Sequence, residues 1–176
     1  MNADGYHCDR YLLLREFSDI KVFPELATPK KRIQIVESRL ERKASILYER
    51  RTVTTPQEVA GLARKLYPDF DKEYLYAIYL TSRMEPIAIE LLSIGTLDAT
   101  LVSPRDIIKT ALLSAAAGCI ILHNHPSGGD IVPSAEDIRI TKRLNEACKL
   151  IGVKLFDHII VSDHCYVSLK ERDIIN

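Results

Sequence analysis

The chain has 176 residues, 47% of them hydrophobic, with 24 basic and 24 acidic side chains and four cysteines that form no CxxC pair. These features predict one globular domain. The balanced charge does not favour nucleic-acid binding through bulk electrostatics, and the cysteine spacing does not favour a disulfide framework. No apolar run approaches membrane-spanning length and the first residues lack the pattern of a signal peptide, so we expect a cytoplasmic protein without a membrane partner.

The N-terminal part of the chain is weakly patterned. We interpret residues 1–30 as a variable arm with a short helix over 11–17, and we assign residues 31–176 to the domain itself. The basic run at 30–32 is typical of a solvated segment rather than of a nucleic-acid patch. Alternating apolar residues predict a strand over 32–40.

The next elements carry clear local signals. Thr55, Pro56 and Glu58 have the spacing of a helix capping box with proline at the first helical position, which predicts a helix that ends near Leu66. Two segments rich in branched and aromatic residues follow, and they predict the strands of a hairpin: residues 73–80 and 86–94.

The second half of the chain alternates helices and strands. Ser103 is a predicted helix cap, and the helix is expected to run to about Ala116 and to end before Gly118. The remaining predicted elements are a strand over 119–123, an amphipathic helix over 134–150 with Gly152 as its stop, a strand over 153–161, a short strand over 166–168 and a brief terminal helix. This order predicts an α/β/α (α+β) fold, a mixed sheet flanked by helices.

Two histidines follow the apolar strand of residues 119–122. His123 and His125 are two residues apart, so their side chains are expected on the same face of the strand, and a Pro/Gly loop follows them. A lone histidine is usually structural, but this pair indicates ligands for a metal such as zinc. Asn124 points to the opposite face and is interpreted as a hydrogen-bonding scaffold residue.

Ser134 and Asp137 have two interpretations. Ser-x-x-Asp is a capping motif at the start of a helix, and a helix start can also present Asp137 to a metal while Ser134 both caps and faces the site. Two histidines and one carboxylate make three ligands, and catalytic zinc sites keep three protein ligands with a fourth position for water. We therefore expect one zinc ion per chain.

Polar residues interrupt several apolar segments. A zinc-bound water needs a carboxylate to move its proton, and Glu85, Glu90 and Asp98 are the candidates. Glu90 is favoured because it lies within an apolar strand, where a carboxylate is costly unless it is paired or functional. Asp157 and His158 interrupt a later strand; a satisfied core or edge pair is favoured, and a role behind the metal ligands stays open.

These motifs together resemble a known family. His123-x-His125 with Ser134-x-x-Asp137 and an upstream glutamate resembles the JAMM metal motif of the MPN/JAB superfamily, and the fuller pattern is closest to its RadC branch. The resemblance covers about residues 33–172. The segments that carry it are 95–97, 103–106, 123–128, 133–137 and 157–160.

The resemblance implies a fold, a site and an activity. It implies a JAB/MPN fold similar to that of cytidine deaminases, in which His123, His125 and Asp137 bind zinc. It further implies that Glu90 is the general acid/base and that Ser134 helps to stabilise the oxyanion. The segment between His125 and Ser134 is one residue longer than is usual in the family.

The predicted activity is that of a zinc-dependent hydrolase, a metallopeptidase or isopeptidase acting on a peptide or protein. Two alternatives are a DNA-processing protein such as a metal-dependent nuclease, suggested by the family's name, and a non-enzymatic MPN-type scaffold. Neutral charge does not support DNA as a partner, and residues 1–30 lack the glycine hairpin of the helix-hairpin-helix region found in long RadC proteins. An intact ligand set disfavours the scaffold.

Overall fold

A computed structural model describes residue 34 and residues 36–67, 72–95, 103–126 and 131–175. Residues 38–176 form one compact unit. The strand predicted over 32–40 is wrong for the described part, because residues 34 and 36–40 pair with no strand and their side chains are exposed. The helix predicted over 11–17 lies outside the described residues.

The described residues form three helices and five strands, and the five strands make one sheet. In chain order they are α1 (Pro56–Leu66), β1 (Tyr74–Leu80), β2 (Pro86–Ile94), α2 (Pro104–Leu113), β3 (Gly118–Asn124), α3 (Ala135–Ile151), β4 (Lys154–Val161) and β5 (Tyr166–Ser168). The strand order is β2-β1-β3-β4-β5, and β3 and β4 are parallel while the other neighbours are antiparallel. The predicted mixed sheet flanked by helices is confirmed.

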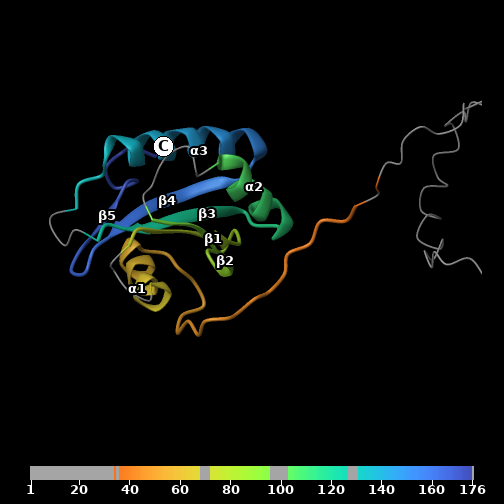
Figure 1. Ribbon diagram of the computed structural model, residues 1–176, viewed down its shortest axis with the longest axis horizontal. Helices are drawn as coiled ribbons and strands as arrows, with labels where there is room; N and C mark the ends of the chain where they lie inside the picture. The colour runs from red at the N-terminus through yellow and green to blue at the C-terminus, as the bar shows by residue number, and fades with distance from the viewer. Residues whose placement is uncertain (1–33, 35, 68–71, 96–102, 127–130, 176) are drawn as a thin grey trace, which may run out of the picture. The chain divides into compact units, whose positions relative to one another are not determined.

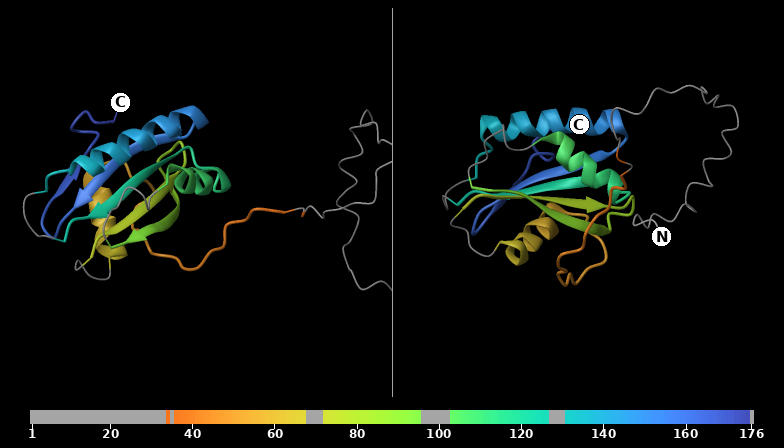
Figure 2. Two further views of the ribbon diagram at one scale, coloured as in Figure 1. Left: turned by 45° about the horizontal axis from the view of Figure 1, so that its top comes forward. Right: turned by 45° about the vertical axis from the view of Figure 1, so that its right-hand side comes forward.

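The sheet lies between two layers of helices, with α2 and α3 over one face and α1 over the other (Figure 1), and the two turned views agree (Figure 2). Strand β1 is buried on both faces: Leu75, Ala77 and Tyr79 belong to the core beneath α2 and α3, whereas Tyr74 and Tyr76 belong to the core beneath α1. Each large apolar side chain buried in this way contributes about 1.5–3 kcal/mol. None of the described helices is long and apolar enough to span a bilayer.

Local sequence signals set the ends of the longest helix. Ser134 and Asp137 form a reciprocal capping box at the start of α3. Gly152 caps its end with a left-handed backbone (φ 76°), a conformation that glycine adopts without steric cost. Thr55 and Glu58 form the predicted capping box of α1.

One predicted helix boundary and one predicted helix are wrong. Helix α2 ends at Leu113, earlier than predicted, because the hydroxyl of Ser114 donates to the carbonyl of Thr110 and Ala115 takes a left-handed φ of 52°. The brief helix predicted after residue 168 is a series of turns, in which Asp173 takes a left-handed φ of 58° that stops helical propagation.

The β3–α3–β4 unit determines where a site can form. Because β3 and β4 are parallel neighbours, α3 crosses over the sheet between them, and its N-terminus lies near the carboxyl end of β3. Ligands in open α/β sheets bind outside the carboxyl ends of strands, and this is where the two histidines and Asp137 lie.

Candidate metal centre

Strand β3 and the residue that follows it bring two imidazoles close together. His123 is fully buried near the end of the strand, and His125 follows the strand directly, held by its backbone N–H, which donates to the carbonyl of Val161 at 2.9 Å. The two Nε2 atoms lie 3.0 Å apart. Asn124 points away from them, accepts from the Tyr74 N–H at 2.7 Å and donates to the carbonyl of Lys72 at 2.7 Å, which confirms its predicted scaffold role.

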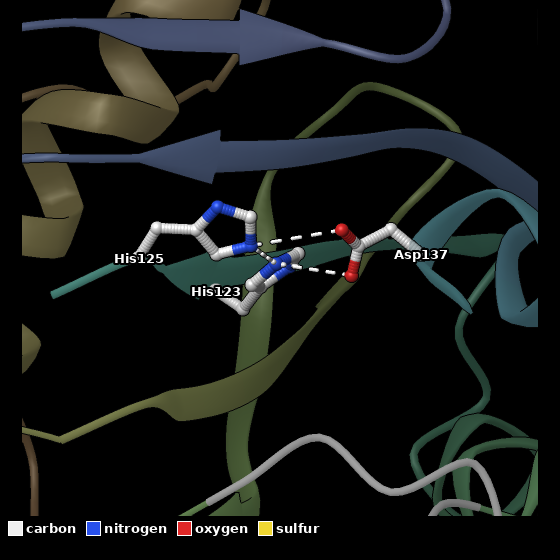
Figure 3. A group of neighbouring side chains, drawn as sticks. All are labelled: His123, His125 and Asp137. Atoms are coloured by element: carbon white, nitrogen blue, oxygen red, sulfur yellow. Dashed lines mark hydrogen bonds and ion pairs between the residues drawn. The ribbon is translucent and has the colours of Figure 1, made fainter. Parts of the chain in front are cut away.

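The first turn of α3 delivers the carboxylate. Asp137 Oδ2 accepts from the backbone N–H of Ser134 at 2.7 Å, and the Ser134 hydroxyl oxygen accepts from the N–H of Asp137 at 3.1 Å. This capping box aims the buried carboxylate at the histidines: Oδ1 lies 3.3 Å from His123 Nε2, and Oδ2 lies 3.6 Å from His125 Nε2 (Figure 3).

The three side chains form a group that can hold a metal ion. A tetrahedral ion with bonds of ~2.0–2.1 Å to nitrogen and oxygen places neighbouring donor atoms ~3.3 Å apart. Of the three observed separations, 3.3 Å equals that value, and 3.0 and 3.6 Å lie just below and just above it. Imidazole nitrogen and carboxylate oxygen are also the donor types that divalent transition metals bind.

The electrostatics of the group favour a charged carboxylate beside a neutral imidazole. Burial alone would raise the pKa of Asp137, but the neighbouring imidazoles of His125 and His123 and the hydrogen bond from the backbone N–H of Ser134 hold that pKa below its usual range. Burial and the neighbouring His158 hold the pKa of His123 well below 6.5. The nearby carboxylate of Asp137 raises the pKa of His125. Metal ligands must be deprotonated, and two of the three meet this condition over most of the pH range.

Two further buried residues lie behind His123: sequence reasoning left a role behind the metal ligands open for His158 and did not name Thr141. His158 Nε2 on β4 is 2.8 Å from His123 Nδ1, and Thr141 Oγ1 on α3 is 2.6 Å from His158 Nδ1. Burial lowers the pKa of His158 to about 4, so this imidazole is neutral at pH 7. The signals available were a histidine within an apolar strand and a threonine one helical turn after Asp137.

Asp157 is the satisfied core residue that was predicted. Its Oδ2 accepts from the hydroxyl of Ser168 at 2.6 Å, and its Oδ1 accepts from the N–H groups of His158 at 2.7 Å and Lys170 at 3.1 Å. Burial raises the pKa of this carboxyl against the opposing effect of those bonds. Asp157 thereby fixes the backbone of His158 and the turn after β5.

Glu90 is not a member of the metal-binding group. It lies on the edge strand β2, half-buried, and its carboxylate accepts from the hydroxyl of Tyr79 at 2.6 Å. Burial and this bond to Glu90 raise the pKa of Tyr79 far above 10, so the tyrosine remains the donor. Glu85 forms an ion pair with Arg51 at 2.6 Å, and Asp98 lies outside the described residues.

Strand register places Glu90 on the same sheet face as His123. Glu90 is opposite Ala77, and Ala77 is opposite Ile121, which lies two residues before His123 on β3. Side chains two residues apart on a strand share a face, so both face the layer of α2 and α3.

Comparison with known proteins identifies relatives. The chain is 44% identical over 119 residues to a UPF0758 protein of Desulforudis audaxviator, 44% over 133 residues to one of Clostridium acetobutylicum and 45% over 123 residues to one of Alkaliphilus metalliredigens. These matches cover 68%, 76% and 70% of this chain but 51%, 58% and 53% of the relatives, so the chain spans about half their length. The family profile described as "RadC-like JAB domain" matches residues 53–174, and the chain belongs to this family.

Proposed function

We propose that this protein is a zinc-dependent hydrolase that cleaves an amide bond of a peptide or protein, as a peptidase or isopeptidase. The observation that carries the proposal is the convergence of two imidazole nitrogens and a buried carboxylate at separations that suit one tetrahedral ion. Membership of a JAB family supports hydrolase chemistry at such a site.

His123, His125 and Asp137 would hold the zinc ion through three protein ligands, the number typical of catalytic sites with an open fourth position. When bound, zinc lowers the pKa of a coordinated water to ~7 and polarises a carbonyl oxygen. The buried carboxylate of Asp137 offsets part of the ion's charge, and His123 presents a neutral nitrogen.

Glu90 would accept the proton of the attacking water and pass it to the leaving nitrogen. Glu90 lies two strands away from β3 across the sheet, level with Ile121, which is two residues before His123. This corresponds to a backbone distance of about 12 Å between Glu90 and His123. A glutamate side chain, one water molecule and an imidazole can span that distance. The 2.6 Å bond from Tyr79 limits the orientations of the carboxylate, which a positioned acid/base requires.

Ser134 would donate a hydrogen bond to the oxyanion. A hydroxyl has one hydrogen and two lone pairs, and the helix cap uses one lone pair to accept from the N–H of Asp137. The hydrogen therefore stays available for a substrate oxygen. The exposed position of Ser134, three residues from a metal-binding carboxylate, supports this assignment.

The test combines metal content with hydrolysis. Protein purified without a histidine tag is expected to contain one zinc per chain by mass spectrometry and to cleave fluorescein-labelled casein or a lysine ε-linked isopeptide. His123→Ala should lose the zinc, whereas Glu90→Gln should keep the zinc and lose at least a hundredfold in cleavage rate. Glu85→Gln, on the same hairpin, is the matched control and should retain both. Absence of stoichiometric zinc, or full cleavage by Glu90→Gln, would refute the proposal.

A further inference from the structure

The hydrogen bonds behind His123 form a chain whose direction is fixed at one end. The carbonyl oxygen of Asp137 can only accept, and Thr141 Oγ1 lies 2.6 Å from it. The single hydrogen of that hydroxyl is therefore donated to the carbonyl. The chain starts on the same residue whose carboxylate faces the metal site.

This donor assignment fixes which nitrogen of His158 carries a hydrogen. With its hydrogen committed, Thr141 Oγ1 can only accept from His158 Nδ1 at 2.6 Å, so Nδ1 carries the single N–H of this imidazole, whose burial disfavours the charged form. His158 Nε2 is left with a lone pair, 2.8 Å from His123 Nδ1. That lone pair requires a hydrogen on His123 Nδ1, and His123 Nε2 is left free.

We propose that Thr141 and His158 are positioning residues that fix His123 in the tautomer whose Nε2 can bind the metal. This inference rests on the proposed metal site and extends it. A metal-binding histidine usually donates its other N–H to a carboxylate, a carbonyl or water. Here the acceptor is a second neutral imidazole, which α3 orients through a threonine.

The opposite tautomer conflicts with the geometry. Hydrogen on His123 Nε2 would require His158 to donate from Nε2 and to accept at Nδ1 from Thr141. The carbonyl of Asp137 would then face a hydroxyl oxygen at 2.6 Å with no hydrogen between them. Thr141, His158 and His123 are all buried, so water does not replace the missing donor.

The other face of His123 has two neighbours: His125 Nε2 at 3.0 Å, and Asp137 Oδ1 at 3.3 Å, which is longer than a normal N–H···O hydrogen bond. The free Nε2 of His123 lies 3.0 Å from His125 Nε2, and two lone pairs at that distance would repel. In the metal-free protein the hydrogen between them therefore belongs to His125. The two imidazoles have opposite tautomers, and a metal ion takes the place of that single hydrogen.

The tautomers can be read directly from the wild-type chain. Long-range 1H–15N correlation spectra of the full, metal-free protein with 15N-labelled histidine distinguish Nδ1–H from Nε2–H forms. His123 and His158 are expected as Nδ1–H tautomers and His125 as the Nε2–H tautomer. Hydrogen on Nε2 of His123 would overturn the proposal, and this measurement needs no variant to fold.

Zinc affinity provides a second readout that does not depend on hydrolysis. Thr141→Val removes the acceptor for His158 without touching His123, and it should weaken zinc binding about ten- to a hundredfold, measured by competition with a fluorescent chelator. Thr141→Ser keeps the hydroxyl and should stay within about threefold of wild type. Equal affinity of Thr141→Val and wild type would overturn the proposal.

The outcomes separate the two proposals. If the tautomers and affinities are as expected but casein and the isopeptide are not cleaved, the hydrolase proposal fails and the positioning role stands. If zinc-dependent cleavage is found and His123 carries hydrogen on Nε2, the hydrolase proposal stands and the positioning role fails.

Discussion

The buried imidazole of His158 makes the stability of the metal-free protein depend on pH. Burial lowers its pKa from 6.5 to about 4, so between these values the unfolded chain binds a proton that the folded chain does not. The free energy of unfolding therefore falls as the pH is lowered from 6.5 to 4. A pKa lowered from 6.5 to about 4, at ~1.4 kcal/mol per pH unit, corresponds to about 3–4 kcal/mol in full, of which about 3 kcal/mol is lost between pH 7 and pH 4.

Neighbouring groups add to this pH dependence or oppose it. The lowered pKa of His123 acts in the same direction as that of His158. The raised pKa of His125 acts in the opposite direction, since it adds stability at low pH that is lost as the pH rises through the folded value. The lowered pKa of Asp137 stabilises the folded chain above its usual value near 3.8, and this contribution is lost mainly at lower pH.

Urea unfolding of the chelator-treated protein at pH 4, 5, 6 and 7 measures the effect. His158→Gln keeps a side chain that can accept from His123 but cannot titrate, and its stability should change with pH by about 3 kcal/mol less than that of wild type. His164→Gln alters an exposed histidine and is the matched control, which should follow wild type. If His158→Gln loses as much stability on acidification as wild type, the pH dependence does not come from this residue.

Two further predictions concern α3. Asp137→Asn removes the only carboxylate of the His123, His125 and Asp137 group, so it should weaken zinc binding by at least a hundredfold in a chelator competition assay. Glu136→Gln is the control: it alters an ion pair with Arg139 and should bind zinc like wild type. Gly152→Ala should lower the free energy of unfolding by about 1 kcal/mol in urea, because Gly152 has a positive φ; an unchanged midpoint would contradict this.

The sequence predicted the elements that carry their own signals. The capping boxes of α1 and α3, the hairpin of β1 and β2 and the glycine stop at residue 152 are each encoded within a few neighbouring residues. The strand predicted over 32–40 failed because strand formation needs a partner strand, which alternation alone does not specify. The predicted end of α2 was wrong because Ser114 and Ala115 have no conspicuous helix-breaking residue beside them.

The residues of the site likewise divide into those that sequence could bring together and one that it could not. His123, His125 and Asp137 come from one strand–loop–helix segment, so their approach could be expected from sequence. The longer segment expected between His125 and Ser134 does not prevent this approach, because the structure brings Asp137 to both histidines. His158 could not be assigned to the site, because its contact with His123 depends on β4 lying parallel and adjacent to β3, in the register that pairs Ile121 with His158.

Asp137 connects the stability of the helix with the chemistry of the site. Its carboxylate accepts from the N–H of Ser134 at the N-terminus of α3, where the helix dipole favours negative charge. The charge is therefore stabilised before any metal binds, and the ligand already has its binding orientation. The imidazole of His123 is likewise held from behind by His158. Because the fold supplies both constraints, we expect a metal ion to bind with little rearrangement of the chain and with an affinity that depends on the hydrogen bonds around its ligands.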